Sequence, residues 1–495
     1  MEKLLWENDA TALAALVKKG EVEPAALVEA AIARAEKVNP AINAIAVRLF
    51  DQARKRAETA RKTTPFAGVP FVLKDLDIAM AGVPRHAGSR KPAQTPTQNS
   101  VLLDRYLGAG LIPILTATSP EFGLRLVTES AAFGVTRNPW DTGRITGGSS
   151  GGPAAMVAAG VVPMAHGGDG GGSIRVPAAC TGLVGMKPSR GRVPLTPHES
   201  EVWFGFVAVH ALTRSVRDSA ALLDLTHGAD RLAPYEARSP TGPFSAAAAR
   251  DPGRLRIGVY SGSPLGLPVS EETLRALEMA AALARDGGHS VEPVDLAFVG
   301  REFMTDFGRT VACSLAGTVR VEAAEAGKPF SASLERATRI LARYGELVSG
   351  GALYAALERL SATARRIVAE TAQYDAVLMP LIAHPPPACG ALDAKGADIV
   401  VEELVDRLRL TRLLTIDSLY DQLLDKSLWL THWPAIQNVT GQPAIALPVH
   451  VTDDGLPLGV QAVGRPGDEE TLFSLAAQME KQSGWLNRRA GLLRP

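Results

Sequence analysis

The chain has 495 residues, and its 52 Lys and Arg residues balance 52 Asp and Glu residues, so its formal net charge is zero. This balance gives no electrostatic reason to expect binding to nucleic acid or to an anionic membrane surface. Hydrophobic residues make up 46% of the chain and charged residues 21%, which is typical of a globular protein and excludes a disordered one.

The cysteines and the N-terminus exclude further classes of protein. Cys180, Cys313 and Cys389 form no CxxC pair, which excludes a disulfide framework and the common zinc modules. The first residues lack a basic start followed by an apolar run, and no stretch of 18 apolar residues occurs. We therefore expect no signal peptide, no membrane-spanning helix and a cytoplasmic location.

The first 62 residues are predicted to be helical, in three segments that form an outer layer. The first predicted helix covers 11–19 and ends at Gly20, a typical helix stop. Pro24 is placed to open the second, which is expected to end at 39–40, and the third covers about 50–61.

From Gly68 onward, short apolar strands alternate with helices, a pattern typical of an α/β protein with a parallel or mixed sheet. The predicted strands are 68–75, 111–116, 161–166, 255–260, 290–294, 374–379, 443–451 and 457–463, and the predicted helices are 101–110, 154–159, 271–285 and 468–481. Residues 255–294 form a predicted βαβ unit, and the last two strands a hairpin around Asp453-Asp454-Gly455. Residues 228–253 are the best candidate for a linker.

The densest anomaly is a run of glycines: ten of the 27 residues from Gly147 to Ser173 are glycine. Glycine destabilises ordinary helices and strands, so this density indicates backbone that must approach something closely. The glycines do not match a phosphate-binding loop, because no Gly-Lys-Ser or Gly-Lys-Thr follows and the dinucleotide spacing is absent.

Two serine-based interpretations remain. Gly147-x-Ser149-x-Gly151 matches the nucleophile elbow of an α/β-hydrolase, which would need a late histidine such as His432 or His450. Alternatively, the two glycine-serine clusters together build one serine site with a lysine base.

The second interpretation explains more of the chain. In order, the sequence carries GVPFVLKD at 68–75, GGSSGG at 147–152, DGGGSIR at 169–175 and GLVGMKPS at 182–189. With NPWD at 138–141 and NVTGQPA at 438–444, these motifs resemble the amidase signature family of amide hydrolases over nearly the whole chain. The resemblance is closest to the branch that contains the 6-aminohexanoate cyclic-dimer (nylon oligomer) hydrolases and related bacterial amidases.

The resemblance implies a fold. It predicts one α/β domain over 1–495, with a single mixed sheet of about eleven strands wrapped by helices on both faces. The parts would be the outer helices at 1–67, the signature core at 68–220, a surface connector at 228–253, and a remainder at 254–495 that completes the sheet.

The resemblance also implies catalytic roles, without metal or other cofactor. Ser173 is expected to be the nucleophile, Ser149 a bridging serine after a cis peptide bond, and Lys74 the base. A lysine must be neutral to act as a base, and the apolar neighbours at 71–73 are expected to favour that form.

Around these three residues, the resemblance and the glycines imply further contacts. The backbone N–H groups of Gly170, Gly171, Gly172 and Ser173 are expected to form an oxyanion hole. Asp169 and Arg175 are expected to hold the nucleophile loop as a buried pair, with an exposed surface pair as the alternative. Ser150 is expected to join the same network.

The substrate is harder to predict, because residues 116–123 depart from the family pattern. Leu124 follows where the nylon-oligomer branch has a polar residue, so we expect an apolar pocket. Its lining residues are expected among Leu124, Phe133, Trp203, Phe204, Phe206, Ile436 and Asn438, with core packing as the alternative for each. The Leu-rich segment 402–433 is expected to be a lid over the site, or else an outer helix pair.

We therefore expect a hydrolase of small hydrophobic or aryl amides, with esters and carbamates (urethanes) as further substrates. A glutaminase-like subunit of an amidotransferase complex is the main alternative, and a catalytically inactive relative is another. No nucleic acid or membrane partner is expected, and a homodimer is allowed for. His86, His166, His198 and His384 lack the spacing of metal ligands.

Overall fold

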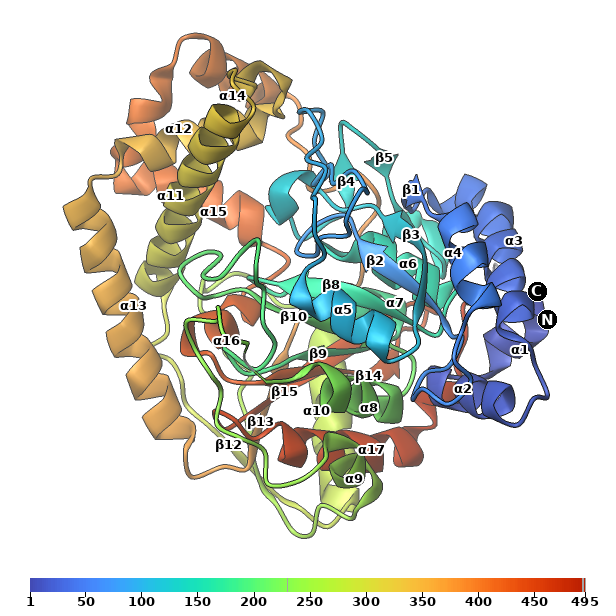
Figure 1. Cartoon of the computed structure of the whole chain (residues 1–495). Coiled ribbons are helices and arrows are strands. Elements are labelled where there is room, and N and C mark those ends of the chain that lie inside the picture. Colours follow the sequence, from blue (N-terminus) through green and yellow to red (C-terminus); the bar gives the residue numbers. More distant parts are fainter. Residues whose placement is uncertain (229, 492–493, 495) are drawn as a thin grey trace.

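One sheet of eleven strands runs through the computed structural model, which describes residues 1–228, 230–491 and 494 (Figure 1). In spatial order its strands are β1 (Ile45–Arg48), β3 (Ile112–Ala117), β2 (Pro70–Lys74), β8 (Met164–Asp169), β10 (Ala208–Thr213), β9 (Val184–Lys187), β14 (Ala444–Val451), β15 (Pro457–Gly464), β13 (Ala376–Pro380), β11 (Arg256–Val259) and β12 (Ser290–Pro293). β2 runs parallel to β3 and β8, and β11 parallel to β12 and β13, while the other neighbours are antiparallel. The expected mixed α/β sheet is confirmed.

Four helices lie at one end of the sheet, next to β1 (Figure 1). They are α1 (Glu2–Glu7), α2 (Ala10–Lys18), α3 (Pro24–Ile42) and α4 (Phe50–Glu58). The second predicted helix, which opens at Pro24, corresponds to α3. The prediction that it ends at 39–40 was wrong, because α3 continues through Pro40 to Ile42 and is capped by Asn43, whose φ is 49°. A proline in the last turn removes one hydrogen bond, which the buried apolar face of this long helix tolerates.

Helices flank the sheet and fix the segments that carry the glycine- and serine-rich motifs. α6 (Gly151–Ala158) packs against β2, β3 and β8, and α7 (Arg175–Thr181) packs against β9, β14 and β15. α8 (Val216–Thr226) and α10 (Glu271–Asp286) both contact α17 (Glu469–Ser483), which lies on β14 and β15. α5 (Val101–Gly108) contacts α8.

The predicted connector at 228–253 has more structure than expected. It contains a short helix, α9 (Phe244–Ala249), that packs against α8 and α17. Phe244 is buried there, with its ring centroid 5.9 Å from that of Phe473. A single buried aromatic residue thus orders part of a segment whose composition lacks periodicity.

The predicted βαβ unit and hairpin are confirmed. β11 and β12 are parallel and joined through α10, while β14 and β15 are antiparallel and joined around Asp453-Asp454-Gly455. In both cases the prediction rested on the local pattern of apolar residues and on the residues of the turn, and the structure contains the elements that these patterns predict.

A group of helices stands apart from the sheet at the upper left of Figure 1. It contains α11 (Arg301–Glu325), α12 (Arg336–Leu347), α13 (Gly350–Thr371), α14 (Ala397–Arg407) and α15 (Asp417–Leu428), and α16 (Pro434–Thr440) leads from it into β14. α12 packs along α11, and α14 and α15 pack on these two helices. Within the described residues, no helix is long and apolar enough to cross a membrane.

The close approach of α12 to α11 generates a test of the fold. A Cβ on Gly345 would lie 2.5 Å from the carbonyl carbon of Ala312, so Gly345→Ala is expected to destabilise the protein by about 1–3 kcal/mol. Gly108→Ala, at the end of α5, meets open space and is expected to be neutral or to stabilise by up to about 1 kcal/mol. Urea unfolding midpoints compare the two variants, and equal midpoints would contradict this packing.

Candidate active site

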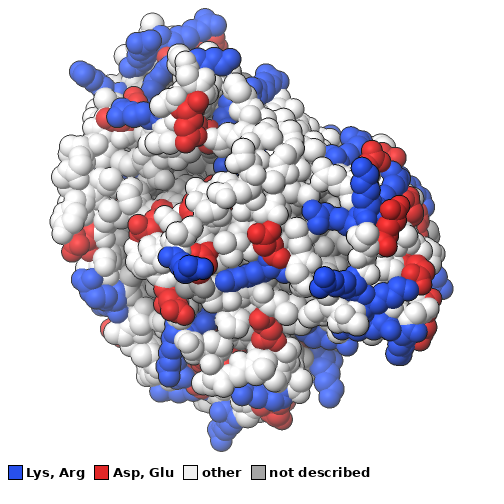
Figure 2. Space-filling model, in the orientation of Figure 1, with Lys and Arg blue, Asp and Glu red and all other residues white. Residues whose placement is uncertain are grey.

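A cavity of about 1110 Å³ lies between the sheet and α11. Figure 2 shows the molecule hollowed on this side, with Lys and Arg intermixed with Asp and Glu over the face shown. The walls of the cavity come from the loop after β2, the loop at 85–96, the loop at 198–207 and one side of α11. Lys74, Ser149 and Ser173, which lie up to 99 positions apart in the sequence, all line it.

Lys74 ends β2 with its side chain buried. Its Nζ donates a hydrogen bond to the Ser149 Oγ at 3.0 Å and lies 3.5 Å from the Gly168 carbonyl oxygen. It also forms an ion pair with Asp77, at 2.6 Å from Oδ2. Residues 71–73 are buried as expected, but the sequence analysis missed Asp77, which gives the lysine a charged partner as well as an apolar setting.

The two serines lie on neighbouring loops. Ser149 follows a cis Gly148–Ser149 peptide bond, as expected, and comes just before α6, while Ser173 lies between β8 and α7. The Ser150 backbone N–H donates to the Ser173 carbonyl oxygen at 3.1 Å, and the Ser150 Oγ lies 3.3 Å from both the N and the O of Gly168. Among the described residues no hydrogen bond joins the Ser149 and Ser173 hydroxyls; such bonds often tighten only when substrate binds.

Asp169 and Arg175 form a fully buried ion pair below Ser173. The Arg175 Nε and Nη2 each lie 2.9 Å from a carboxylate oxygen of Asp169. Arg175 also donates to Gln437, Gln461, Asn438 and the Pro434 carbonyl oxygen. The alternative of an exposed pair is wrong, because the interior supplies acceptors for the whole guanidinium group.

The charge on Asp169 is stabilised in place. Although burial alone would raise its pKa, the Arg175 guanidinium and a hydrogen bond from Asn438 hold the pKa of Asp169 well below its usual range. The carboxylate accepts the backbone N–H of Gly172 at 2.8 Å and of Ile174 at 3.2 Å. Asp169 therefore fixes the backbone on both sides of Ser173.

This arrangement corrects one part of the predicted oxyanion hole. The Gly172 N–H donates to Asp169 and is not free to donate into the cavity. In the described part of the chain, the N–H groups of Gly170, Gly171 and Ser173 have no such acceptor. The sequence could not show this, because a glycine can supply either a donor or merely room for a turn.

Three of the predicted pocket residues line the cavity, namely Leu124, Trp203 and Phe204. The others lie elsewhere: Phe133 packs edge-on against His86 at 5.6 Å, and Phe206 and Ile436 are buried in the core. Asn438 is also buried, and its side chain donates to the backbone oxygens of Asp169 and Phe206. Its role here is to hold the nucleophile loop and not to line the cavity.

The expected lid is also corrected. None of the residues described at 402–433 lines the cavity; the segment lies on α11 and α12, as in the alternative of outer helices, and several of its leucines are exposed. The cavity wall is α11 itself, through Ser314, Leu315, Thr318 and Glu322. α11 has mixed polar and apolar residues and gave no distinct sequence signal.

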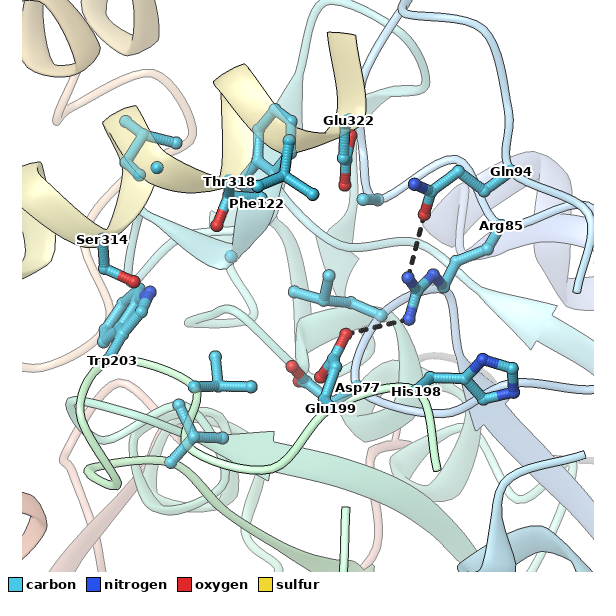
Figure 3. A pocket seen from close by; sticks show the side chains of 18 of the residues that line it. Asp77, Arg85, Gln94, Phe122, His198, Glu199, Trp203, Ser314, Thr318 and Glu322 are labelled. Carbon is cyan, nitrogen blue, oxygen red and sulfur yellow. Dashed lines mark hydrogen bonds and ion pairs between the residues drawn. The ribbon is translucent and has the colours of Figure 1, made fainter. Parts of the chain in front are cut away.

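Six of the charged side chains that line the cavity form three ion pairs. Figure 3 shows Glu199 beside Asp77, with its carboxylate 3.0 Å from the Arg85 Nη1, and Arg85 in turn 2.9 Å from Gln94. Lys91 pairs with Glu322 of α11 at 2.9 Å. With the Lys74–Asp77 pair, these contacts give three of the cations that line the cavity a carboxylate partner; Glu201, Glu325 and Lys328 line it as well.

The two late histidines considered for a nucleophile elbow, His432 and His450, have other partners than Ser149. The His432 Nδ1 lies 3.0 Å from the Ser263 Oγ, and His450 pairs with Glu272, so neither supports a nucleophile elbow at Ser149. His198 lines the cavity, with its Nε2 3.0 Å from the Gln98 carbonyl oxygen. Across the residues the structure describes, no group of three or more His, Cys, Asp or Glu side chains is arranged to hold a metal ion.

The chain was compared with known proteins. The amidase family profile matches residues 26–473. The 6-aminohexanoate-cyclic-dimer hydrolase of Pseudomonas sp. (strain NK87) is 34% identical, over 99% of this chain and 98% of that protein. The solved structure of a 6-aminohexanoate cyclic dimer hydrolase complexed with substrate superposes with a TM-score of 0.91 at 33% identity, covering 99% of this chain and 100% of the other. A bacterial aryl acylamidase structure gives 0.84 at 26% identity, covering 99% of each chain.

The fold of this chain is thus shared with the solved structures of a 6-aminohexanoate cyclic dimer hydrolase and an aryl acylamidase. The chain belongs to the amidase family. The expectation of an amidase-family hydrolase that acts on amide C–N bonds is confirmed.

The buried ion pair generates a test of stability. Asp169→Asn leaves Arg175 buried without its counter-charge and is expected to lower the free energy of unfolding by about 3–5 kcal/mol at neutral pH. Because the folded state lowers the pKa of Asp169, its stabilising contribution is present at neutral pH and is lost as pH falls below about 4. The difference in free energy of unfolding between the wild type and Asp169→Asn should therefore become smaller at acidic pH.

Denaturant unfolding as a function of pH checks this expectation. The matched control is Asp51→Asn, which removes a carboxylate from an exposed pair with Arg54 and should change stability by less than about 1 kcal/mol. Equal losses in the two variants would show that burial of the Asp169–Arg175 pair is not what stabilises the loop.

Proposed function

We propose that this protein cleaves neutral amides through an acyl-enzyme formed on Ser173, with Ser149 as the bridging serine and Lys74 as the base. The observation that carries the proposal is the 3.0 Å hydrogen bond from the buried Lys74 Nζ to the Ser149 Oγ, in the same cavity as Ser173. A serine hydroxyl is a weak nucleophile until a neighbouring base accepts its proton.

The proposed steps conserve every proton. Ser173 attacks the amide carbonyl carbon while its proton passes to Ser149, and the Ser149 proton passes to Lys74. The oxyanion that forms would accept hydrogen bonds from the N–H groups of Gly170, Gly171 and Ser173. When the C–N bond breaks, Ser149 returns a proton to the leaving amine and Lys74 replaces it; water then repeats the sequence on the ester.

The paired charges favour an uncharged substrate. The cations Lys74, Arg85 and Lys91 each have a carboxylate within 3.0 Å, which makes these three less available to anchor a carboxylate of the substrate. Apolar side chains, including Leu124, Trp203 and Phe204, line the remaining space. These features support hydrophobic, cyclic or aryl amides as substrates, with esters and carbamates (urethanes) as further ones.

The comparisons support the same class of substrate. Relatives at 33–34% identity are named for a cyclic amide dimer, and a neighbour at 26% identity for aryl acylamides. The glutaminase-like subunit of an amidotransferase is less supported, because these full-length relatives are hydrolases. Hydrolysis by the purified chain without a partner distinguishes the two.

Substitution of the reacting groups tests the mechanism. Ser173→Ala is expected to reduce amide hydrolysis to background because the acyl-enzyme cannot form, and Lys74→Ala is expected to lower kcat/KM by about 10²–10⁴-fold because the base is lost. p-Nitroanilide hydrolysis measures both. Exposed Ser361→Ala and Lys18→Ala serve as controls and should retain full activity. A Lys74→Ala variant with the wild-type rate would refute the proposed base.

A homologous acyl series tests the apolar pocket. The wild type is expected to gain in kcat/KM from acetyl to butyryl to hexanoyl anilides, since a buried methylene is worth about 1–3 kcal/mol in a fitted pocket. Leu124→Asn should flatten the series without abolishing hydrolysis, because Leu124 lines the cavity and takes no part in the proposed proton transfers.

The matched control is Leu404→Asn, an exposed leucine of α14 that lies outside the cavity. It should leave the series unchanged. If kcat/KM of the wild type does not rise along the acyl series, the acyl group binds elsewhere. If Leu404→Asn flattens the series as much as Leu124→Asn does, the segment 402–433 contacts the substrate after all.

A further inference from the structure

The Asp77 carboxylate is the charged group nearest to the Lys74 amine. Its Oδ2 lies 2.6 Å from Nζ, closer than the Ser149 Oγ at 3.0 Å. Both side chains of this pair are almost entirely buried. The mechanism above uses Lys74 and Ser149 but assigns no part to Asp77.

The backbone is shaped to bring this carboxylate to the lysine. Asp77 has a φ of 64°, in the left-handed region that residues with a side chain rarely adopt. Across from it, the Gly168 backbone has no side chain, and a Cβ there would lie 2.6 Å from the Asp77 Cγ and overlap Oδ2. The turn at Asp77 and the glycine at Gly168 therefore make room for one contact, which adds to the reasons for the glycine density around Ser173.

The other ionisable groups near this pair are engaged elsewhere. Glu199 faces Asp77 but pairs with Arg85, and Asp75 accepts the backbone N–H groups of His86 and Gly88. Burial, together with the nearby Lys74 charge, lowers the pKa of His166 well below its usual value, which favours its neutral form. Among the described residues, Asp77 is thus the carboxylate in contact with the Lys74 amine.

We propose that Asp77 is a positioning residue for the reaction: its carboxylate fixes the Lys74 amine against Ser149, and its negative charge influences the pH range in which the enzyme is active. The proposal rests on the proposed role of Lys74 as the base. No covalent step is added; Asp77 acts through Lys74 and does not touch the substrate.

The contact between Asp77 and Lys74 has two effects on the reaction, and they act in opposite directions. A carboxylate 2.6 Å away interacts more favourably with a charged amine than with a neutral one. The same contact holds the Nζ within hydrogen-bond distance of the Ser149 Oγ, which favours transfer once the amine is neutral. Removing the carboxylate should therefore lower the pH that activity requires and also lower the maximal rate.

The test is the pH dependence of kcat/KM for a neutral anilide, which reports on groups of the free enzyme. Asp77→Asn and Asp77→Gly are the variants, because Asn and Gly are the residues best suited to a positive φ, so both keep the turn. In both, the midpoint of the rise in kcat/KM is expected to move to lower pH by about 1–3 units, and the plateau to fall by up to about 100-fold.

Glu199→Gln is the matched control, since it removes a carboxylate from the same cavity that does not contact Lys74. Its midpoint is expected to move by less than about half a unit, because the lost charge is more distant and already paired. Unfolding midpoints confirm that each variant is folded.

The outcomes separate this inference from the proposed function. An unmoved midpoint in both Asp77 variants, with Lys74→Ala and Ser173→Ala inactive, would overturn the role of Asp77 and leave the proposed mechanism standing. A loss of rate at all pH values without a shift would mean that Asp77 only supports the structure. If Lys74→Ala keeps its activity, the mechanism itself fails, whatever the Asp77 variants do.

Discussion

The buried pair of Asp169 and Arg175 is the interaction on which the geometry of the site depends. Asp169 ends β8, Arg175 begins α7, and the guanidinium reaches the backbone of α16 at Pro434. Two buried charges are costly unless each finds partners, and here every N–H of the pair has an acceptor. Five residues separate the two, so the chain between them must turn tightly, and that turn presents Ser173 to the cavity.

Close packing of backbone explains why this region is so rich in glycine. A Cβ on Gly148 would lie 2.6 Å from the Val127 nitrogen, and one on Gly152 would lie 2.6 Å from the Thr118 nitrogen. These contacts hold the loop that carries Ser149 and the start of α6 against β3 and the chain that follows it. Glycine here provides space, and at Gly172 it provides a donor for Asp169; neither use amounts to flexibility.

The site combines a rigid floor with a separate wall. The floor comes from the ends of β2 and β8 and from the two serine loops, all fixed by the central sheet. The wall comes from α11, which belongs to a helical group packed mainly on itself. Because floor and wall are separate, the reacting groups can keep their geometry while the side chains of α11 and of the loop at 85–96 shape the space for substrate. The Lys91–Glu322 ion pair joins this loop to α11.

The sequence by itself determined the alternation of strands and helices, the hairpin and the βαβ unit, because each rests on local periodicity and turn chemistry. It also singled out Lys74, Ser149 and Ser173, whose motifs are short and contiguous. Only the tertiary structure decided which groups meet: that Asp77 contacts Lys74, that Gly172 donates to Asp169, that Asn438 supports the loop, and that α11 and not 402–433 walls the cavity. These depend on contacts between residues distant in the chain, or on which of several available partners a donor takes, and neither leaves a local pattern in the sequence.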